Sequence, residues 1–257
     1  MQEQKTIFIT GAASGIGRAV AELFVSKGWF VGIYDIDEEA LKELQDAFGD
    51  KHICSGRIDV TDEESVQNAL THFEKRGRGR LDVLFNSAGL FYTGPFETIN
   101  PQRHRQITAV NITGVFNSTY YAFPLLKRNT ASKVINMASG SALYGTPDMA
   151  SYSASKFAIR GFTEALNIEW AQHDIHVCDI IVPFVDTPMV RNVEKTHSMK
   201  LLGINLTAQD VARTVWKAVH GKKVHYVMTL QFKLLWTLTG WMPGRLNRLT
   251  TKLIAGY

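Results

Sequence analysis

The sequence is poor in cysteine and has no metal-binding pattern. Cys54 and Cys178 are its only cysteines, and because they lie far apart and form no CxxC pair, we expect no disulfide framework. This usage is typical of a reducing compartment, so we expect a cytoplasmic location. The eight histidines show no spacing suited to metal ligands, and we expect no metal site.

Long apolar runs and charge blocks are also missing. No run approaches the ~18 apolar residues of a membrane-spanning helix. The chain begins directly with a strand-like segment, so we expect no signal peptide. The net charge of +4 is mild and spread along the 257 residues. Nucleic-acid binding is therefore not indicated.

What the sequence does contain is a regular alternation of strand-like and helix-like segments. Continuous apolar segments indicate strands buried on both faces, and the segments between them have helical spacing. We expect strands at 5–10, 30–34, 52–58, 81–85, 133–138, 175–182 and 224–229. Expected helices cover 18–27, 38–48, 101–128, 152–170 and part of 188–219. A further helix is expected after Thr61, which forms a capping-box pattern with Glu64. This order predicts an α/β fold, a doubly wound parallel sheet in one domain over residues 1–229, followed by a helical extension over 230–257.

A glycine-rich turn follows the first expected strand and opens the first helix. Its glycines are Gly11, Gly15 and Gly17. Glycines let the backbone approach a pyrophosphate, and a helix N-terminus offers free N–H groups to it. Asp35 ends the next strand about 20 residues on, where an acid binds the adenosine ribose of a dinucleotide. Because a carboxylate repels a 2′-phosphate, NAD is favoured over NADP.

Tyr152 and Lys156 lie four residues apart in an expected helix, so their side chains share one face. A phenol has a pKa of about 10, too high for acid–base chemistry at neutral pH unless a positive charge lowers it. A lysine one turn away could provide that charge, which makes Tyr152 a candidate proton donor and acceptor.

Together these motifs resemble the short-chain dehydrogenase/reductase family, which has a Rossmann fold. The resemblance covers residues 5 to about 229 and rests on Thr10–Gly17 for T-G-x-x-x-G-x-G, on Asn86–Gly89 for N-N-A-G, and on Tyr152–Lys156 for Y-x-x-x-K. Ser139 stands thirteen residues before Tyr152, which is the family's usual separation. Asn111 falls at the position of the family's catalytic asparagine.

The resemblance implies hydride transfer between a nicotinamide and a carbinol or carbonyl carbon. Tyr152 would pass the proton, and Lys156 would lower the pKa of Tyr152 and bind the nicotinamide ribose. Ser139, rather than nearby Ser141, would donate to the substrate oxygen. Asn111 would hold a water that links Lys156 to solvent, or else serve only the helix that contains it. The expected cofactor contacts are Gly11, Ser14, Gly15, Ile16, Gly17, Asp35, Asp59, Val60, Asn86, Ala88, Gly89, Tyr152, Lys156, Pro183, Val185 and Thr187.

The loops expected around the substrate are apolar and aromatic. Phe184 stands where the family has glycine after a proline, so it either narrows the substrate pocket or packs beneath the loop. The predicted pocket residues are Phe91, Ser139, Ser141, Met149, Tyr152, Phe184 and Met189, and the same loops contain Leu90, Tyr92, Leu143, Tyr144 and Val190. This lining suggests a hydrophobic alcohol or ketone of lipid, steroid or aromatic type, although several of these residues could instead belong to the core.

The last segment, 230–257, reads as an amphipathic basic helix after Pro243. It could pack on the subunit or on a second copy, close over the substrate, or lie on an anionic membrane with Trp236 and Trp241 at the interface. Packing or closure is favoured, because an apolar stripe is usually buried. The family commonly forms dimers and tetramers, so a homodimer or homotetramer is expected.

The leading hypothesis is an NAD-dependent alcohol dehydrogenase or ketone reductase. Two alternatives remain, namely an NADPH-dependent 3-oxoacyl thioester reductase, against which Asp35 argues, and a catalytically silent NAD-binding regulator or scaffold. The complete set of Asn111, Ser139, Tyr152 and Lys156 argues against a silent protein.

Overall fold

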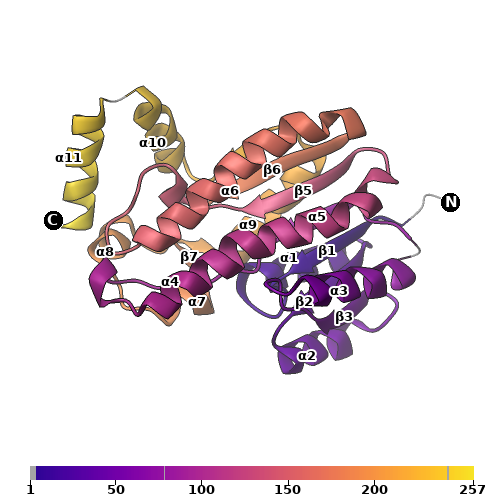
Figure 1. The fold of residues 1–257 in the computed structure, drawn as a ribbon. Coiled ribbons are helices and arrows are strands. Elements are labelled where there is room, and N and C mark those ends of the chain that lie inside the picture. The colour runs from indigo at the N-terminus through magenta and orange to yellow at the C-terminus, as the bar shows by residue number, and fades with distance from the viewer. Residues whose placement is uncertain (1–3, 78, 242) are drawn as a thin grey trace.

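A seven-stranded parallel sheet forms the centre of the computed structural model, which describes residues 4–77, 79–241 and 243–257 (Figure 1). The strand order is β3-β2-β1-β4-β5-β6-β9, and helices cover both faces. The strands are β1 (Thr6–Thr10), β2 (Phe30–Asp35), β3 (Ile53–Arg57), β4 (Val83–Asn86), β5 (Ser132–Met137), β6 (Ile175–Ile181) and β9 (His225–Val227). The predicted doubly wound sheet is confirmed.

The helices fall close to their predicted places. They are α1 (Gly15–Ser26), α2 (Glu38–Phe48), α3 (Glu63–Arg76), α4 (Pro101–Thr108), α5 (Gly114–Lys127), α6 (Ala150–Glu169), α7 (Pro188–Arg191), α8 (His197–Leu202), α9 (Ala208–His220), α10 (Leu230–Trp241) and α11 (Gly244–Ala255). Two short strands that the sequence did not predict, β7 (Val185–Asp186) and β8 (Leu206–Thr207), pair beside the main sheet. No helix among the described residues is long and apolar enough to cross a membrane.

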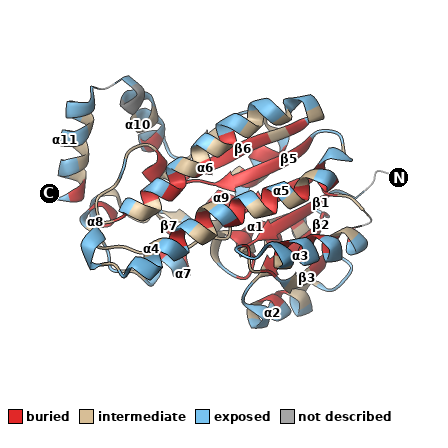
Figure 2. Ribbon diagram, viewed as in Figure 1, coloured by how far each residue is buried: buried red, intermediate tan, exposed pale blue. Residues whose placement is uncertain are grey.

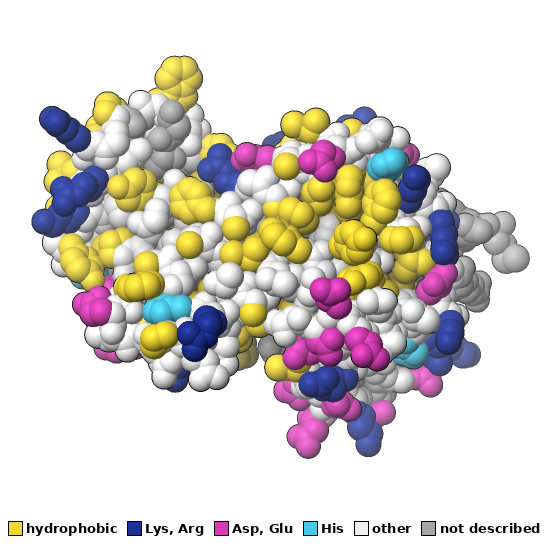
Figure 3. Space-filling model, viewed as in Figure 1, with side chains coloured by type: hydrophobic (Ala, Val, Ile, Leu, Met, Phe, Trp, Pro, Cys, Tyr) yellow, Lys and Arg dark blue, Asp and Glu magenta, His cyan; other side chains and the backbone are white. Residues whose placement is uncertain are grey.

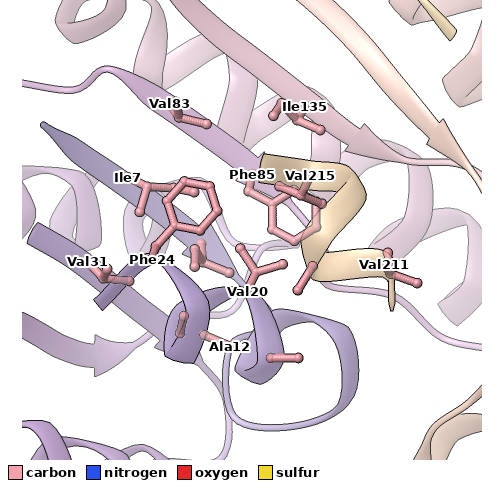
Figure 4. Close-up of a cluster of buried hydrophobic side chains, with 14 of the residues drawn as sticks. Ile7, Ala12, Val20, Phe24, Val31, Val83, Phe85, Ile135, Val211 and Val215 are labelled. Carbon is pink, nitrogen blue, oxygen red and sulfur yellow. The ribbon is translucent and has the colours of Figure 1, made fainter. Parts of the chain in front are cut away.

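The central strands are buried on both faces, because successive side chains of a strand point to opposite sides of the sheet. Ile7 belongs to the core between the sheet and helices α1 and α9, where Phe24, Phe85 and Val215 surround it (Figure 4). Its neighbour Phe8 belongs to the second core on the opposite face. Figure 2 shows this burial along the strands, with exposure concentrated on the outer faces of the helices.

The start of α3 differs by one residue from the capping-box prediction. Asp62, not Thr61, is the N-cap residue, and its carboxylate accepts the Glu64 N–H at 3.0 Å. The Thr61 hydroxyl instead donates to Asp59 Oδ1 at 2.7 Å. Aspartate and threonine both cap helices well, and here the hydroxyl is taken by Asp59, so the cap moves one position along.

The predicted long helix over 101–128 contains an irregular turn. A π-helical turn, Ala109–Thr113, joins α4 to α5. Such turns add one residue to a helical turn and are frequent at functional sites. Asn111 lies within it, 1% exposed.

The tail 230–257 forms two helices, of which α10 contacts β9 and α11 contacts α8 (Figure 1). Phe232 of α10 is buried against Gly140, and Tyr257 after α11 donates to Asp148 Oδ1 at 2.7 Å. Trp236 stacks with the Arg160 guanidinium at 4.3 Å and with the His225 ring at 4.9 Å. These contacts direct the Trp236 ring toward the subunit, so the membrane contact that was one of three possibilities for the tail would not include this residue.

Candidate active site

A cavity of about 510 Å³ opens at the carboxyl ends of the central strands. The strand order reverses between β1 and β4, and ligands of doubly wound sheets bind beside such a reversal. The predicted cofactor residues that line it are Gly11, Ser14, Gly15, Ile16, Asp35, Asp59, Val60, Ala88, Gly89, Tyr152, Lys156, Pro183, Val185 and Thr187. Its size lies within the ~300–1,000 Å³ usual for small-molecule sites.

The glycine loop can hold a pyrophosphate because its glycines permit close backbone approach. A Cβ on Gly11 would lie 2.7 Å from the Ala88 Cα, and Gly11 also has a φ of 69°. A Cβ on Gly17 would lie 2.0 Å from the Gly11 carbonyl oxygen, so Gly17 packs the helix against the loop and does not line the cavity. Ser14, Gly15 and Ile16 line the cavity where α1 begins, so the residues present fit the phosphates of a dinucleotide at the N-terminus of this helix.

Asp35 lies at the end of β2, on the wall of the cavity. Its Oδ2 accepts the Ala13 N–H at 3.0 Å, and its Oδ1 accepts the Ile36 N–H at 2.7 Å. These bonds fix the carboxylate at the cavity wall, where it adds negative charge. On the other side of the cavity, the Thr10 hydroxyl accepts the N–H groups of Ser87 and Ala88 and holds that turn in place.

Asn86 lies beneath the cavity and does not line it. Its Nδ2 donates to Thr119 Oγ1 at 3.0 Å and to Asn136 Oδ1 at 2.9 Å. Asn136 in turn donates to Thr163 Oγ1 at 3.0 Å. This buried chain of hydrogen bonds ties β4, β5, α5 and α6 together, so Asn86 supports the site from below.

Tyr152 and Lys156 both reach the cavity from α6. The Lys156 Nζ lies 5.5 Å from the centre of the Tyr152 ring and donates to the Met137 carbonyl oxygen at 2.8 Å. Burial raises the pKa of Tyr152 to about 12, although a hydrogen bond with Ser139 acts in the opposite direction. Burial also lowers the pKa of Lys156 to about 8. The protein groups alone therefore do not lower the phenol pKa as the sequence pattern predicted, because desolvation outweighs the stabilising contacts.

Ser139 stands at the end of β5, beside Tyr152. Its Oγ accepts the Ser141 N–H at 3.2 Å, and its hydroxyl also forms a hydrogen bond with Tyr152. Ser141 is 7% exposed and lines a different, smaller cavity. The geometry thus agrees with Ser139, rather than Ser141, as the serine next to the reacting oxygen.

Asn111 is held by protein groups on both ends of its amide. Its Oδ1 accepts the Leu90 N–H at 2.7 Å, and its Nδ2 donates to the Leu90 carbonyl oxygen at 3.0 Å and to Ser155 Oγ at 3.1 Å. Asn111 therefore fixes the loop after β4, which supplies Leu90 and Phe91 to the cavity. It does not line the cavity itself.

The part of the cavity around Tyr152 is apolar. Phe91 meets the Tyr152 ring edge-on at 4.6 Å, and Phe184, Met189 and Val190 line the wall nearby. Met149, predicted to line the pocket, is 1% exposed and packs in a small core cluster with Phe91 and Met199, because it precedes the first turn of α6 on its inner side.

Sequence patterns missed several lining residues. These are Ile36, Ile58, Thr61, Ser87, Gln106, Ala109, Val110, Met137, Ala138, Val182 and Pro188. Ile36, Met137 and Ala138 could have been predicted, because they lie where β2 and β5 end, next to or within two residues of predicted lining residues. Gln106, Ala109 and Val110 depend on which face of α4 and its π turn meets the sheet, for which the sequence offers no signal.

A second cavity of about 100 Å³ adjoins the first. Both are lined by Ser139, Val182, Pro183 and Phe184, so these residues form a shared wall. The tail helices contribute Phe232, Leu235 and Ile254 to the smaller cavity. Among the described residues, no cluster of three or more histidine, cysteine or acidic side chains could hold a metal ion.

The sequence pattern of the short chain dehydrogenase family matches residues 5–198. A 2,5-dichloro-2,5-cyclohexadiene-1,4-diol dehydrogenase of Sphingobium indicum is 34% identical over 189 residues, which are 73% of this chain and 75% of that protein. A 3-oxoacyl-[acyl-carrier-protein] reductase of Thermotoga maritima is 32% identical over 79% of this chain and 84% of its own length. A 3α-hydroxysteroid dehydrogenase of Mediterraneibacter gnavus is 30% identical over 74% of this chain and 77% of its own length.

Solved structures agree with these relatives. A short-chain dehydrogenase/reductase of Burkholderia phymatum, in complex with NAD, superposes with a TM-score of 0.82 at 25% identity and covers 92% of each chain. A 3-ketoacyl-(acyl-carrier-protein) reductase of Brucella melitensis complexed with NADH has a TM-score of 0.80 at 28% identity, covering 88% of this chain and 97% of its own. The motifs, the sheet and these matches together show that the chain belongs to the short-chain dehydrogenase/reductase family of oxidoreductases.

Proposed function

We propose that the protein is an NAD-dependent oxidoreductase that interconverts a hydrophobic secondary alcohol and its ketone. The observation that carries this proposal is the apolar wall around the Tyr152 hydroxyl, formed by Phe91, Phe184, Met189 and Val190. Few charged groups are available there to bind a sugar or an acid. Among the described residues, the ionisable side chains that line the whole cavity are Asp35, Asp59, Tyr152 and Lys156.

The residues present fit a nicotinamide dinucleotide. The glycine loop would hold its pyrophosphate, Asp35 its adenosine ribose, and Tyr152 with Lys156 its nicotinamide ribose. The bound nicotinamide supplies or accepts the hydride. The Asp35 carboxylate would repel a 2′-phosphate, which is why we propose NAD rather than NADP.

Tyr152 would donate a proton to the carbonyl oxygen in reduction and accept one from the hydroxyl in oxidation. Its raised pKa keeps the phenol protonated at neutral pH, which suits the acid role. The base role requires positive charge nearby, and the Lys156 ammonium over the ring offers it. Ser139, which is hydrogen-bonded to Tyr152 in this structure, would donate its hydroxyl proton to the substrate oxygen as negative charge develops there.

Relatives support a hydrophobic cyclic substrate. One acts on a chlorinated cyclohexadiene diol and another is a 3α-hydroxysteroid dehydrogenase. A third relative is a 3-oxoacyl carrier-protein reductase, which keeps the thioester reductase as the alternative. A silent NAD-binding scaffold is disfavoured, because Ser139, Tyr152 and Lys156 meet in one cavity.

The discriminating experiment is a substrate panel read by nicotinamide absorbance. Cyclic and aromatic secondary alcohols and ketones are compared with 3-oxoacyl thioesters, each with NAD(H) and NADP(H). Turnover of cyclic substrates with NAD(H) is expected. Selective turnover of thioesters with NADPH would favour the alternative, and NAD binding without turnover of either class would favour the scaffold.

We also propose that the protein forms a homodimer through α5 and α6. Exposed apolar side chains gather on these adjacent helices, namely Phe116, Tyr120, Phe157 and Ile168 (Figure 3). Tyr120 is 71% exposed and Ile168 is 78% exposed. Because a patch of this kind marks an interaction site, Tyr120→Asp is expected to shift the sedimentation coefficient from dimer to monomer. A monomeric parent protein would contradict the assignment.

A further inference from the structure

One side of α10 is apolar and faces outward. Leu230, Leu234, Leu238 and Trp241 follow one another at intervals of three or four residues, so they share a face of the helix. They are 83%, 59%, 44% and 88% exposed, respectively. The opposite side is the one that packs inward, with Phe232 at Gly140 and Trp236 at Arg160. Packing on the subunit therefore explains the apolar side chains on only one side of this helix.

The outward side of α11 repeats the pattern. Leu246, Leu249 and Leu253 share one face and are about half or more exposed. The inward side again packs, with Ile254 and Ala255 at the smaller cavity and His197 against Gly256. The two helices thus form one hairpin that is apolar inside and also apolar outside, which is unusual for a surface in contact with water.

The same hairpin is basic. Residues 230–257 contain four basic side chains and no aspartate or glutamate. The basic residues, all exposed, are Lys233, Arg245, Arg248 and Lys252. Figure 3 shows hydrophobic and basic side chains together over α11, whereas many of the acidic side chains on this face lie over α2 and α3. Asp148, the acid in contact with the tail, already accepts the Tyr257 hydroxyl.

We propose that the outward face of α10 and α11 docks on an anionic lipid surface. An amphipathic helix with exposed leucine, tryptophan and basic residues lies in the plane of a membrane interface, held by apolar burial and by attraction to acidic headgroups. Each helix has 12 residues, well short of the ~20 needed to span a bilayer. The hairpin therefore rests on the surface.

A second copy of the chain fits this face less well than lipid does. A symmetric contact would place the same patch of each copy against the other, and each patch contains four cations without an acid to pair them. Like charges facing each other oppose such a contact, whereas anionic headgroups match them. Charge complementarity thus selects lipid over self-association.

Co-sedimentation of the full-length protein with vesicles tests the proposal. Vesicles of phosphatidylcholine with phosphatidylserine are compared with vesicles of phosphatidylcholine alone, at low and high salt. The variants are Leu234→Gln with Leu238→Gln for the apolar part, and Arg245→Gln, Arg248→Gln and Lys252→Gln together for the basic part. The matched control replaces three exposed lysines far from the tail, Lys42, Lys51 and Lys75, by glutamine.

The parent protein and the control are expected to bind anionic vesicles and to release them at high salt. The basic triple variant should lose roughly a hundredfold in partition coefficient, at about fivefold per cation, and the double leucine variant should also bind more weakly. NAD binding by all variants shows that they fold. Absence of binding to anionic vesicles, or equal binding by parent and tail variants, would overturn the proposal. A tail variant that changes only the sedimentation coefficient in the absence of lipid would overturn it in favour of a self-interface.

Discussion

The Lys156 ammonium lies over the ring of Tyr152, with Nζ 5.5 Å from the ring centre, while it donates to the Met137 carbonyl oxygen at 2.8 Å. The lysine is thus fixed to β5 by one hydrogen bond and faces the aromatic ring at the same time. Burial of this cation is costly, because its pKa falls from 10.5 to about 8.

This cost predicts a pH-dependent stability. Below pH 8 the ammonium is charged in both the folded and the unfolded protein, and the desolvation penalty is fully present. Between pH 8 and 10.5 the folded protein releases this proton first, so the contribution of Lys156 to the free energy of unfolding rises with pH. Replacing Lys156 by methionine should remove this contribution, which the fall in pKa from 10.5 to about 8 puts at about 3 kcal/mol.

Urea unfolding at several pH values between 8 and 10 measures the effect as the difference between Lys156→Met and the parent. The difference is needed because burial raises the pKa of the Cys54 and Cys178 thiols, which act in the opposite direction in both proteins. Lys75→Met, on the exposed side of α3, is the matched control and should leave the pH dependence of the parent unchanged. If the free energy of unfolding changes with pH in the same way for Lys156→Met and the parent, the buried ammonium does not contribute to the pH dependence.

Tyr152→Phe is expected to abolish turnover, by at least about 10²-fold, while NAD binding survives. The substitution removes one hydroxyl and keeps the ring that packs on Phe91. Steady-state kinetics and fluorescence titration with NADH measure the two effects separately. Tyr121→Phe removes a hydroxyl bonded to Glu63 outside the cavity and should be silent. Undiminished turnover in Tyr152→Phe would refute the proton-transfer role.

Asp35→Asn is expected to narrow the preference for NAD over NADP. The amide keeps an oxygen that can accept the Ala13 N–H, so the glycine loop should remain in place, but the charge that repels a 2′-phosphate is gone. The ratio of kcat/KM for the two cofactors should shift by roughly tenfold, which corresponds to about 1.4 kcal/mol. Glu39→Gln, in the first turn of α2, serves as the control. An unchanged ratio would count against the ribose contact.

Gly140→Ala should displace α10. A Cβ on Gly140 would lie 2.1 Å from the Phe232 ring, so the ring must move, at a cost of about 1–3 kcal/mol. A Cβ on Gly145, five residues later in the same loop, would meet no described atom within 4 Å beyond its chain neighbours, which makes Gly145→Ala the matched control. Chemical unfolding and tryptophan fluorescence, through Trp236, report the change. Equal stability of the two variants would contradict the packing of the tail on this loop.

The positions of Gly11, Asp35, Ser139 and Pro183 could be predicted from the sequence. In a parallel sheet the carboxyl ends of all strands meet at one edge, so residues that end strands converge whatever the loops do. The direction of each side chain could not be predicted in this way. Asn86 lies at the correct edge but its side chain points into the interior, Gly17 packs against the backbone of Gly11, and Met149 packs behind the cavity wall.

The structure differs from the sequence-based expectation at two further places, and in both a contact with a neighbouring residue decides the outcome. Thr61 and Asp62 are both good helix caps, and the hydrogen bond between Thr61 and Asp59 decides between them. Trp236 and Trp241 are both suited to an interface, and the contacts of Trp236 with Arg160 and His225 decide which one turns inward. The helix cap depends on a competing neighbour in the sequence, and the direction of Trp236 depends on residues that are distant in the sequence but close in space; residue type alone encodes neither.

The π turn at Ala109–Thr113 has a consequence for how this helix tolerates change. One additional residue in a turn rotates everything after it by about 100° relative to what precedes it. The face of α4 that meets the cavity and the face of α5 that meets the core are therefore set out of phase with each other. Loss of one residue anywhere in this turn would keep the helix but rotate Gln106 away from the cavity or Val115 out of the core, so the length of this turn is constrained as strictly as its composition.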